Sequence, residues 1–375
     1  MQESNQQQTE PTLLEYIWID DAGDVRGKTM VYNKPFETVS DLPLWNYDEL
    51  PYKERGLEVV IQLRPVALFR DPFRGGHHKL VLTEKLDLNF EPHFTNYRAK
   101  AAIIMENASE HEPQFGIEQE YFLLTRKEAI YEYIDRDGNK KAERKFLPYN
   151  WLAHGIPGNG DQFTGRSVGG KVSFGREIAE EHLAACLKAG IKIGGINNEG
   201  LPSQWEFQIG ICDGIEVGDH IWVARYILHR ITEPHNLIAN MECKPYKNFD
   251  GNGLHTNYST KSMREGKEGK KGIEFIREAC VKLCEPEAHK RHLEVYGEGN
   301  EQRLNGGGGG CSSVTCSISK WEESTWAEKT KAASIRIPIE TVNAQQGYLE
   351  DRRPGGYADP YQIISVLVET TLLDE

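Results

Sequence analysis

The stretch Phe115-Gly116-Ile117-Glu118-Gln119-Glu120-Tyr121 is the best starting point for interpreting the whole chain. Successive side chains of an extended strand point to opposite faces, so the odd-numbered residues from Phe115 to Tyr121 share one face. Glu118 and Glu120 share the other. Two neighbouring carboxylates repel each other and lose hydration if that face is buried. Taken alone, the stretch fits a solvated strand, which is the commoner case, or a face that surrounds a positive group.

A second stretch repeats the pattern. In Gln204-Trp205-Glu206-Phe207-Gln208-Ile209, Glu206 and Gln208 lie opposite the aromatic residues. Polar residues alternate in the same way, or lie just beside a turn, elsewhere in the chain: Glu199, His255, Asn257, Ser259, Tyr348, Glu350 and Arg352. We expect the strands that carry them to converge and to place five glutamates and one histidine on one polar face.

The residue types on this face indicate a hard divalent cation. Carboxylate oxygens with one imidazole and no thiolate favour Mg²⁺ or Mn²⁺ over zinc. So many carboxylates could hold more than one ion. For each glutamate alone a surface charge is the simpler explanation, and for His255 it is a hydrogen-bonded core histidine. The recurrence on separate segments is what favours a shared metal site.

Composition limits the class of protein. The chain has 375 residues, of which 38% are hydrophobic and 27% charged, which predicts a soluble globular protein with two domains. Its net charge of −13 argues against general nucleic-acid binding, and no apolar run is long enough for a membrane span. Residues 1–11 are polar without a signal-peptide pattern, and the seven cysteines form no CxxC pair. We therefore expect a flexible tail over 1–11 and a cytoplasmic location.

Hydrophobic patterns predict a β-rich first part and a mixed second part. The expected strands of the first part are 14–20, 25–30, 58–69 and 79–83. The expected helices of the second part are 98–109, 177–189, 219–231, 273–283 and 359–373, with Asp219 and Asp359 as N-caps. Short strands are expected over 191–196, 204–211, 254–259 and 334–337. Residues 131–170, rich in glycine and proline, are expected to form a long functional loop.

Several stretches closely resemble glutamine synthetase of the eukaryotic type. They are Trp45-Asn46-Tyr47-Asp48, Phe69-Arg70-Asp71-Pro72-Phe73-Arg74, Gly116-Ile117-Glu118-Gln119-Glu120-Tyr121, Gln204-Trp205-Glu206-Phe207-Gln208-Ile209-Gly210, Gly218-Asp219-His220-Ile221-Trp222-Val223-Ala224-Arg225, His255-Thr256-Asn257-Tyr258-Ser259-Thr260-Lys261, Ser334-Ile335-Arg336-Ile337-Pro338 and Glu350-Asp351-Arg352-Arg353-Pro354. Together they extend over most of the chain, and their combination is highly specific.

The resemblance implies an α+β fold. A small N-terminal β-grasp domain over 12–97 would precede a catalytic domain over 98–375, in which helices back a curved antiparallel sheet shaped as a funnel or half-barrel. The implied reaction is ATP + L-glutamate + ammonia → L-glutamine + ADP + phosphate, by way of γ-glutamyl phosphate. The implied assembly is a homo-oligomer, two stacked pentameric rings with active sites between neighbouring subunits.

The resemblance also assigns roles to residues. Of two Mg²⁺ or Mn²⁺ ions, one would lie at Glu120, Glu199 and Glu206 and the other at Glu118, His255 and Glu350. ATP would contact Glu206, Asn257, Tyr258, Ser259, Arg336 and Tyr348. Glutamate would contact Gly251, Arg303, Lys331 and Arg352. Catalytic roles would fall to Asp48, Arg303 and Arg336, with Asp48 reaching a neighbouring subunit to bind and deprotonate ammonium. Two cations would neutralise the charge of phosphoryl transfer.

The chain departs from the family pattern at several places. Gly309, within the run Gly306–Gly310, stands where the family has a glutamate on a flap, and residues 311–333 are unlike the family. A glycine run provides no carboxylate and loses much conformational entropy when it is ordered. The other departures are Lys331 for an arginine, Asp250 for an asparagine, Gln114 for an aromatic residue, and residues 49–56 for a Gly-Ser-Ser-Thr-Gly loop.

These departures leave alternatives to the leading interpretation, a metal-dependent glutamate–ammonia ligase. One is a non-catalytic paralogue with a structural, regulatory or ligand-sensing role, and another is an amide ligase that uses a different amine. A phosphate cradle at Gly306–Gly310 is disfavoured because no strand-to-helix context surrounds it. A further alternative is an error in the deduced coding sequence over 311–333, which sequencing of the transcript would detect.

Overall fold

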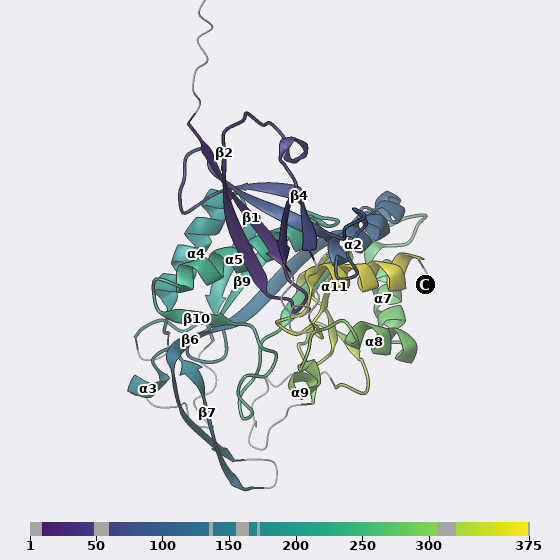
Figure 1. Cartoon of the computed structure of the whole chain (residues 1–375). Helices are drawn as coiled ribbons and strands as arrows, with labels where there is room; N and C mark the ends of the chain where they lie inside the picture. The colour runs from purple at the N-terminus through teal and green to yellow at the C-terminus, as the bar shows by residue number, and fades with distance from the viewer. Residues whose placement is uncertain are drawn as a thin grey trace, which may run out of the picture.

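A computed structural model describes residues 10–48, 60–134, 138–154, 165–170, 173–305 and 320–373. Two sheets organise these residues (Figure 1). The first has five strands in the order β2-β1-β5-β4-β3. The second has nine, with the path β12-β13-β14-β11-β6-β9-β8, and β7 and β10 also pair with β6. Helices back the second sheet, so the predicted α+β fold, with a grasp-like first sheet and a curled half-barrel, is confirmed.

The first sheet contains the four strands expected from the sequence and one more. Its strands are β1 (Thr12–Ile19), β2 (Val25–Tyr32), β3 (Trp45–Asp48), β4 (Val60–Arg70) and β5 (Lys79–Leu86). β1 and β2 pair antiparallel as a hairpin, whereas β1 and β5 run parallel. The 3₁₀ turn η1 (Val39–Asp41) precedes β3, which forms an edge of the sheet.

The second sheet carries all the strands expected in the second part of the chain. Its members are β6 (Gln114–Ile134), β7 (Lys140–Pro148), β8 (Ile193–Asn198), β9 (Gln204–Asp213), β10 (Leu237–Asn240), β11 (Leu254–Ser259), β12 (Trp326–Glu328), β13 (Ile335–Ile337) and β14 (Leu349–Asp351). Its pairings are antiparallel except that of β12 with β13, which is parallel.

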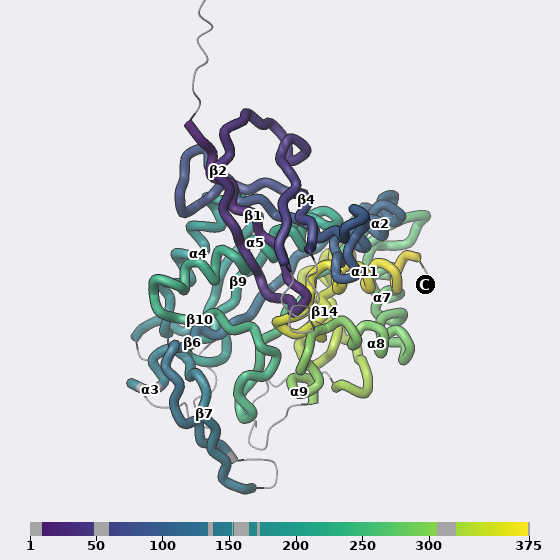
Figure 2. The backbone as a smooth tube through the Cα atoms, in the orientation of Figure 1, coloured from purple at the N-terminus to yellow at the C-terminus, as the bar shows by residue number. Residues whose placement is uncertain are grey.

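The prediction of a loop over residues 131–170 is wrong for residues 131–134 and 140–148, which are strands, and for the short helix at 151–154. β6 continues to residue 134 and pairs with β7, and Figure 2 shows this hairpin extending away from the body of the molecule. Tyr131 is 1% exposed and stacks on Tyr133 at 5.6 Å between ring centroids. Most of the glycines and prolines of this stretch follow the hairpin, so averaging the composition over forty residues hid an alternating strand.

The five predicted helices are all present. The α-helices are α2 (Tyr97–Asn107), α3 (Trp151–His154), α4 (Arg176–Ala189), α5 (Glu216–Thr232), α6 (Lys261–Glu265), α7 (Gly272–Leu283), α8 (Pro286–Leu293), α9 (Asn300–Leu304), α10 (Ile339–Ala344) and α11 (Pro360–Val368). The 3₁₀ turn η2 (Ser109–His111) follows α2, and the π-helical turn η3 (Glu369–Leu373) follows α11. Among the described helices, none is long and apolar enough to cross a membrane.

One of the two predicted caps is correct. The carboxylate of Asp359 accepts hydrogen bonds from the backbone N–H groups of Tyr361 and Gln362, at 2.8 and 3.2 Å, and so caps α11. Asp219 is not a cap, because α5 begins three residues earlier, at Glu216. Asp219 lies inside the helix and forms a bidentate ion pair with Arg98 of α2, at 2.8 and 2.9 Å. Its carboxylate therefore pairs with a guanidinium and does not cap the helix backbone.

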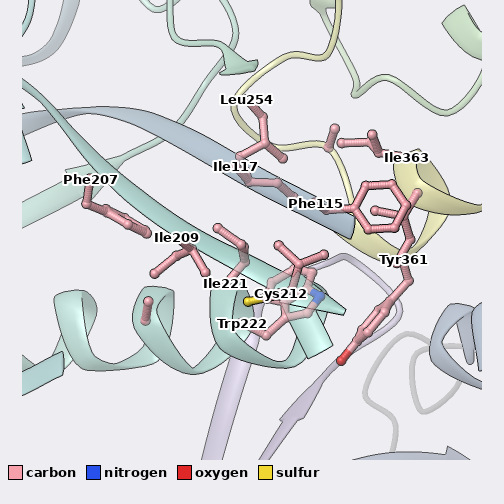
Figure 3. Close-up of a cluster of buried hydrophobic side chains, with 14 of the residues drawn as sticks. Phe115, Ile117, Phe207, Ile209, Cys212, Ile221, Trp222, Leu254, Tyr361 and Ile363 are labelled. Carbon is pink, nitrogen blue, oxygen red and sulfur yellow. The ribbon is translucent and has the colours of Figure 1, made fainter. Parts of the chain in front are cut away.

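The main core lies between the second sheet and its helices. Figure 3 shows Phe115 and Ile117 of β6 beside Phe207 and Ile209 of β9, with side chains of α5 and α11 closing the cluster. All four are at most 2% exposed, as the alternating pattern predicts. The same core extends into the first sheet through residues such as Ile17 and Leu80. A boundary between residues 97 and 98 therefore stays a prediction, because one hydrophobic core passes across it.

A buried histidine makes this core sensitive to acid. The side chain of His182, in α4, is 0% exposed and its Nε2 donates to the backbone oxygen of Ala224 in α5 at 3.0 Å. Burial lowers the pKa of His182 to about 4. In the unfolded chain this ring takes up a proton below about pH 6.5, whereas in the folded chain it stays neutral to about pH 4. Unfolding between these values therefore takes up a proton, and acid favours the unfolded state.

We predict that the replacement His182→Gln flattens the pH dependence of stability. Between pH 7.5 and pH 4.5 the wild-type chain should lose about 2–3 kcal/mol of unfolding free energy through this group alone, and the variant should not. Urea titrations at a series of pH values measure the difference, with the exposed His77→Gln as a control that should follow the wild type. Parallel wild-type and His182→Gln profiles would contradict the prediction.

Candidate active site

The register of four adjacent strands brings the predicted polar residues together. β11 pairs with β6 so that His255 lies opposite Glu118, and β9 pairs with β6 so that Glu120 lies opposite Glu206. On the other side of β11, Asn257 lies opposite Glu350 of β14. Because side chains alternate along each strand, these groups all project from one face of the sheet, opposite the core.

Six of these side chains form two groups. The glutamate group consists of Glu120, Glu199 and Glu206, and the histidine group consists of Glu118, His255 and Glu350. In each group the three candidate ligand atoms lie within 4.8 Å of one another. The resemblance implies the same two sets. The geometry is therefore suitable for two ions, while metal binding itself stays a prediction.

The glutamate group is electrostatically unfavourable without a bound cation. Burial raises the pKa of Glu206 to about 10, and the charges of Glu118, Glu199 and Glu120 add to the rise. Burial and the charge of Glu120 also raise the pKa of Glu199. Burial and the neighbouring charges thus disfavour the ionisation of Glu206 and Glu199, and a bound cation would relieve this. Their oxygen donors fit Mg²⁺ or Mn²⁺.

The histidine group already has cationic neighbours. Arg352 Nη1 lies 3.0 Å from Glu350 Oε1, and Arg336 also forms an ion pair with this carboxylate. Burial disfavours the charge of Glu118, but the nearby imidazole of His255, a hydrogen bond from Asn257 and the charge of Arg336 prevail and lower its pKa to about 2. His255 Nδ1 lies 3.7 Å from Glu118 Oε2 and 3.8 Å from Glu350 Oε1. The donor set of two carboxylates and one imidazole also suits Mg²⁺ or Mn²⁺.

A largely apolar cavity of about 490 Å³ adjoins the histidine group, since Glu118 is among its lining residues. Of the residues assigned to ATP, Asn257, Ser259 and Tyr348 line it. Tyr258 also borders the cavity, but its ring is 0% exposed and stacks on Phe115 in the core, 5.2 Å between centroids. The ring of Tyr258 is therefore not available to a ligand.

Two of the residues assigned to glutamate lie beside the histidine group. Arg303 Nη2 is 3.2 Å from His255 Nε2 and donates to the backbone oxygen of Arg352 at 3.1 Å. Gly251 packs so tightly that a Cβ atom there would lie 1.6 Å from the backbone oxygen of Cys243. Only glycine fits this position, because any side chain would collide with the backbone of Cys243.

Other predicted residues are not brought to the two groups by the described contacts. Lys331 is exposed in the turn between β12 and β13, and Asp48 is exposed at the end of the edge strand β3. An exposed edge position is what a residue that serves a neighbouring subunit would need. Gly306–Gly310, including Gly309, the rest of 306–319, and residues 49–56 lie outside the described residues.

Sequence reasoning missed the groups that support the site. Asn197 Nδ2 donates to Glu199 Oε1 at 2.7 Å, and its Oδ1 accepts from Gln208 Nε2 at 3.0 Å. On the core side of β6, Arg225 Nε donates to Gln119 Oε1 at 2.8 Å. The alternation that exposed Glu118 and Glu120 also placed Gln119 in the core, where a buried amide requires a partner. The need of a buried Gln119 amide for a hydrogen-bond partner was a signal in the sequence for a supporting group of this kind.

Comparison with known proteins gives one answer. Residues 96–268 match the family model described as "Glutamine synthetase, catalytic domain". The chain is 42% identical to a protein named glutamine synthetase from Agaricus bisporus, over 96% of this chain and 93% of that one. It is 44% identical to a chloroplastic/mitochondrial glutamine synthetase from Arabidopsis thaliana, over 97% of this chain and 78% of that one. With two carboxylate-rich groups on one face of the sheet, this similarity shows that the chain belongs to the glutamine synthetase family, of the eukaryotic type.

Proposed function

We propose that this chain catalyses the ATP-dependent ligation of ammonia to the γ-carboxylate of L-glutamate, by way of γ-glutamyl phosphate. The observation that carries the proposal is the pair of carboxylate groups beside a cavity large enough for a nucleotide. Phosphoryl transfer from ATP needs positive charge around the phosphates and a fixed orientation of both substrates.

The residues divide this work. Bound Mg²⁺ or Mn²⁺ ions would neutralise phosphate charge at the glutamate and histidine groups. Arg336 and Arg352, which contact Glu350, add fixed positive charge on the same side. Arg303 and the backbone at Gly251 would orient the glutamate substrate. Asp48 of a neighbouring subunit would hold ammonium and take its proton, which requires a ring-shaped homo-oligomer, taken here as two stacked pentamers.

A second candidate function is favoured by one sequence observation. The run Gly306–Gly310 lacks the glutamate that the family places on its flap, so the chain could retain metal and ligands without turnover. Asp250 also replaces an asparagine that contacts glutamate in the family, and a change of charge at a substrate position would fit a ligase of altered specificity. The metal-binding residues are common to all three functions, so only turnover separates them.

We include a cytoplasmic location in the proposal. The described cysteines Cys186, Cys212, Cys243, Cys280 and Cys284 are all free thiols, which suits a reducing compartment. Plant relatives named chloroplastic show that the family also serves organelles, so fractionation of cells that express the tagged chain is the relevant measurement.

The decisive prediction is glutamine formation by the purified chain from glutamate, ammonia and Mg·ATP. We expect ADP and glutamine in equal amounts, with no product when either the metal or ammonia is omitted. A coupled ADP assay together with chromatography of the amino acids measures both. Product with hydroxylamine or an alkylamine but none with ammonia would support the amide ligase, and binding of Mg·ATP without any product would support the non-catalytic paralogue.

We predict that Glu206→Gln has opposite effects with and without metal. Without metal it should raise the melting temperature by a few degrees, because it removes one of three buried carboxylates that repel each other. With Mn²⁺ it should abolish most of the stabilisation that the wild type gains, because binding to the folded state alone shifts stability. Thermal unfolding over a Mn²⁺ titration measures both, with the exposed Glu110→Gln as a control. A lower melting temperature without metal would count against clustered charge.

We predict that Asp48 acts in a neighbouring active site. Asp48→Asn and Glu206→Gln should each lower kcat at least about 100-fold when assayed alone. Mixed oligomers from co-expression should recover up to about a quarter of wild-type activity, because some interfaces then combine two intact halves. Light scattering of the purified protein checks the ring, and the absence of recovery in verified mixed oligomers would place Asp48 in the site of its own chain.

A further inference from the structure

The strand that carries Glu350 has a second, buried face. Glu350 and Arg352 project towards the site, and by alternation Asp351 and Arg353 project into the core, where both are 0% exposed. Arg353 forms a bidentate pair with Asp351, Nε to Oδ1 at 2.9 Å and Nη2 to Oδ2 at 2.7 Å. A buried pair of this geometry fixes the position of both side chains.

Arg353 also forms hydrogen bonds with residues of two helices. Its backbone oxygen accepts from Asn300 Nδ2 at 2.8 Å and from Arg303 Nη1 at 3.2 Å, both on α9. Its Nη1 donates to the backbone oxygen of Leu283 at the end of α7, 3.1 Å away. Figure 2 shows β14 in the same part of the molecule as these two helices. One residue thus links the strand of Glu350 to the helix of Arg303.

Besides His289 Nδ1 at 3.4 Å and His292 Nδ1 at 3.3 Å, this guanidinium has an acceptor in the segment that is unlike the family. Arg353 Nη1 donates to Ser324 Oγ at 3.0 Å, and Ser324 Oγ lies 2.6 Å from His289 Nδ1. His289 Nε2 is 2.9 Å from the backbone oxygen of Trp321. A carbonyl oxygen can only accept, so Nε2 carries the ring proton and Nδ1 accepts from the serine hydroxyl. The hydrogen bonds therefore run in one direction, from Arg353 through Ser324 and His289 to Trp321.

The same segment is tied to α9 from its other side. The backbone N–H of Trp321 donates to Asn305 Oδ1 at 3.1 Å, and Asn305 directly follows α9. Residues 321–324 therefore contact both elements that carry substrate-binding arginines. We propose that Ser324 is a positioning residue, which through Arg353 aligns Arg303 and Arg352 with the histidine group. As far as substrate is concerned, this role rests on the proposed ligase function.

Three variants test this role. Ser324→Ala removes the hydroxyl that links Arg353 to His289, and Ser324→Thr restores a hydroxyl at the same place. Ser324 is half-buried, so Ser365→Ala serves as the more stringent control: Ser365 is a buried serine whose hydroxyl donates to the backbone oxygen of Tyr361 at 2.7 Å within α11. Loss of one hydrogen bond to a charged group changes an equilibrium constant by about tenfold at most when neighbouring groups rearrange and recover part of the lost free energy.

The first readout uses metal alone. We expect the Mn²⁺ concentration that gives half of the thermal stabilisation to rise about 3- to 10-fold in Ser324→Ala, and to stay within about twofold of wild type in Ser324→Thr and Ser365→Ala. The second readout is kinetic, with KM for glutamate raised about fivefold or more in Ser324→Ala and kcat changed less than KM.

The outcomes separate this proposal from the ligase function. A wild type that binds Mn²⁺ without turnover contradicts the ligase function, and the metal readout still decides the role of Ser324. An unchanged Mn²⁺ midpoint in Ser324→Ala, or an equal shift in Ser365→Ala, overturns the positioning role. A wild type without any Mn²⁺-dependent shift overturns it together with the metal site.

Discussion

The constraint on which the structure depends is the repulsion among five carboxylates on one face of one sheet. Glu120 lies directly opposite Glu206 in the pairing of β6 with β9, where like charges destabilise a sheet. The same two strands bury Phe115, Ile117 and Phe207 on their other face. Each such side chain stabilises the folded chain by about 1.5–3 kcal/mol, so the hydrophobic face holds together strands that their polar face would separate. The same alternation of side chains therefore produces the site on one face of the sheet and the core on the other.

Buried arginines complete this arrangement from behind the sheet. Arg225 of α5 reaches Gln119, which lies between the two glutamates of β6. Arg353 reaches Asp351 of β14, which lies between Glu350 and Arg352 in the chain. In both strands a residue of the core face is fixed by a guanidinium while its neighbours on the other face carry the site. A one-residue slip of either strand would bury a glutamate and expose these contacts. The arginines thus contribute to register as much as to stability.

The sequence was sufficient where one local pattern decided the structure. Alternation around Glu118 and Glu206 predicted which face of each strand is polar, and the resemblance supplied the division of the site residues into two sets, which alternation cannot give. It failed where the deciding contact is distant in the chain. Asp219 has the chemistry of a helix cap, yet its ion pair with Arg98, 121 residues away, places it inside α5. The hairpin of β6 and β7 was missed because glycines and prolines that follow it dominated the composition of the whole stretch.

The support for Arg303 could not be predicted for a similar reason. Ser324 and His289 are ordinary polar residues in sequence, and they acquire a role only because both contact Arg353. Residues 320–324, within the segment where the chain departs from its family, are thus joined to the strand that carries Glu350. Under the proposals made above, metal binding depends on the two groups on the sheet, whereas substrate alignment depends also on this attachment. A chain can therefore retain every metal ligand and still change which substrate its arginines hold, which is why divergence beside an intact site bears on specificity before it bears on fold.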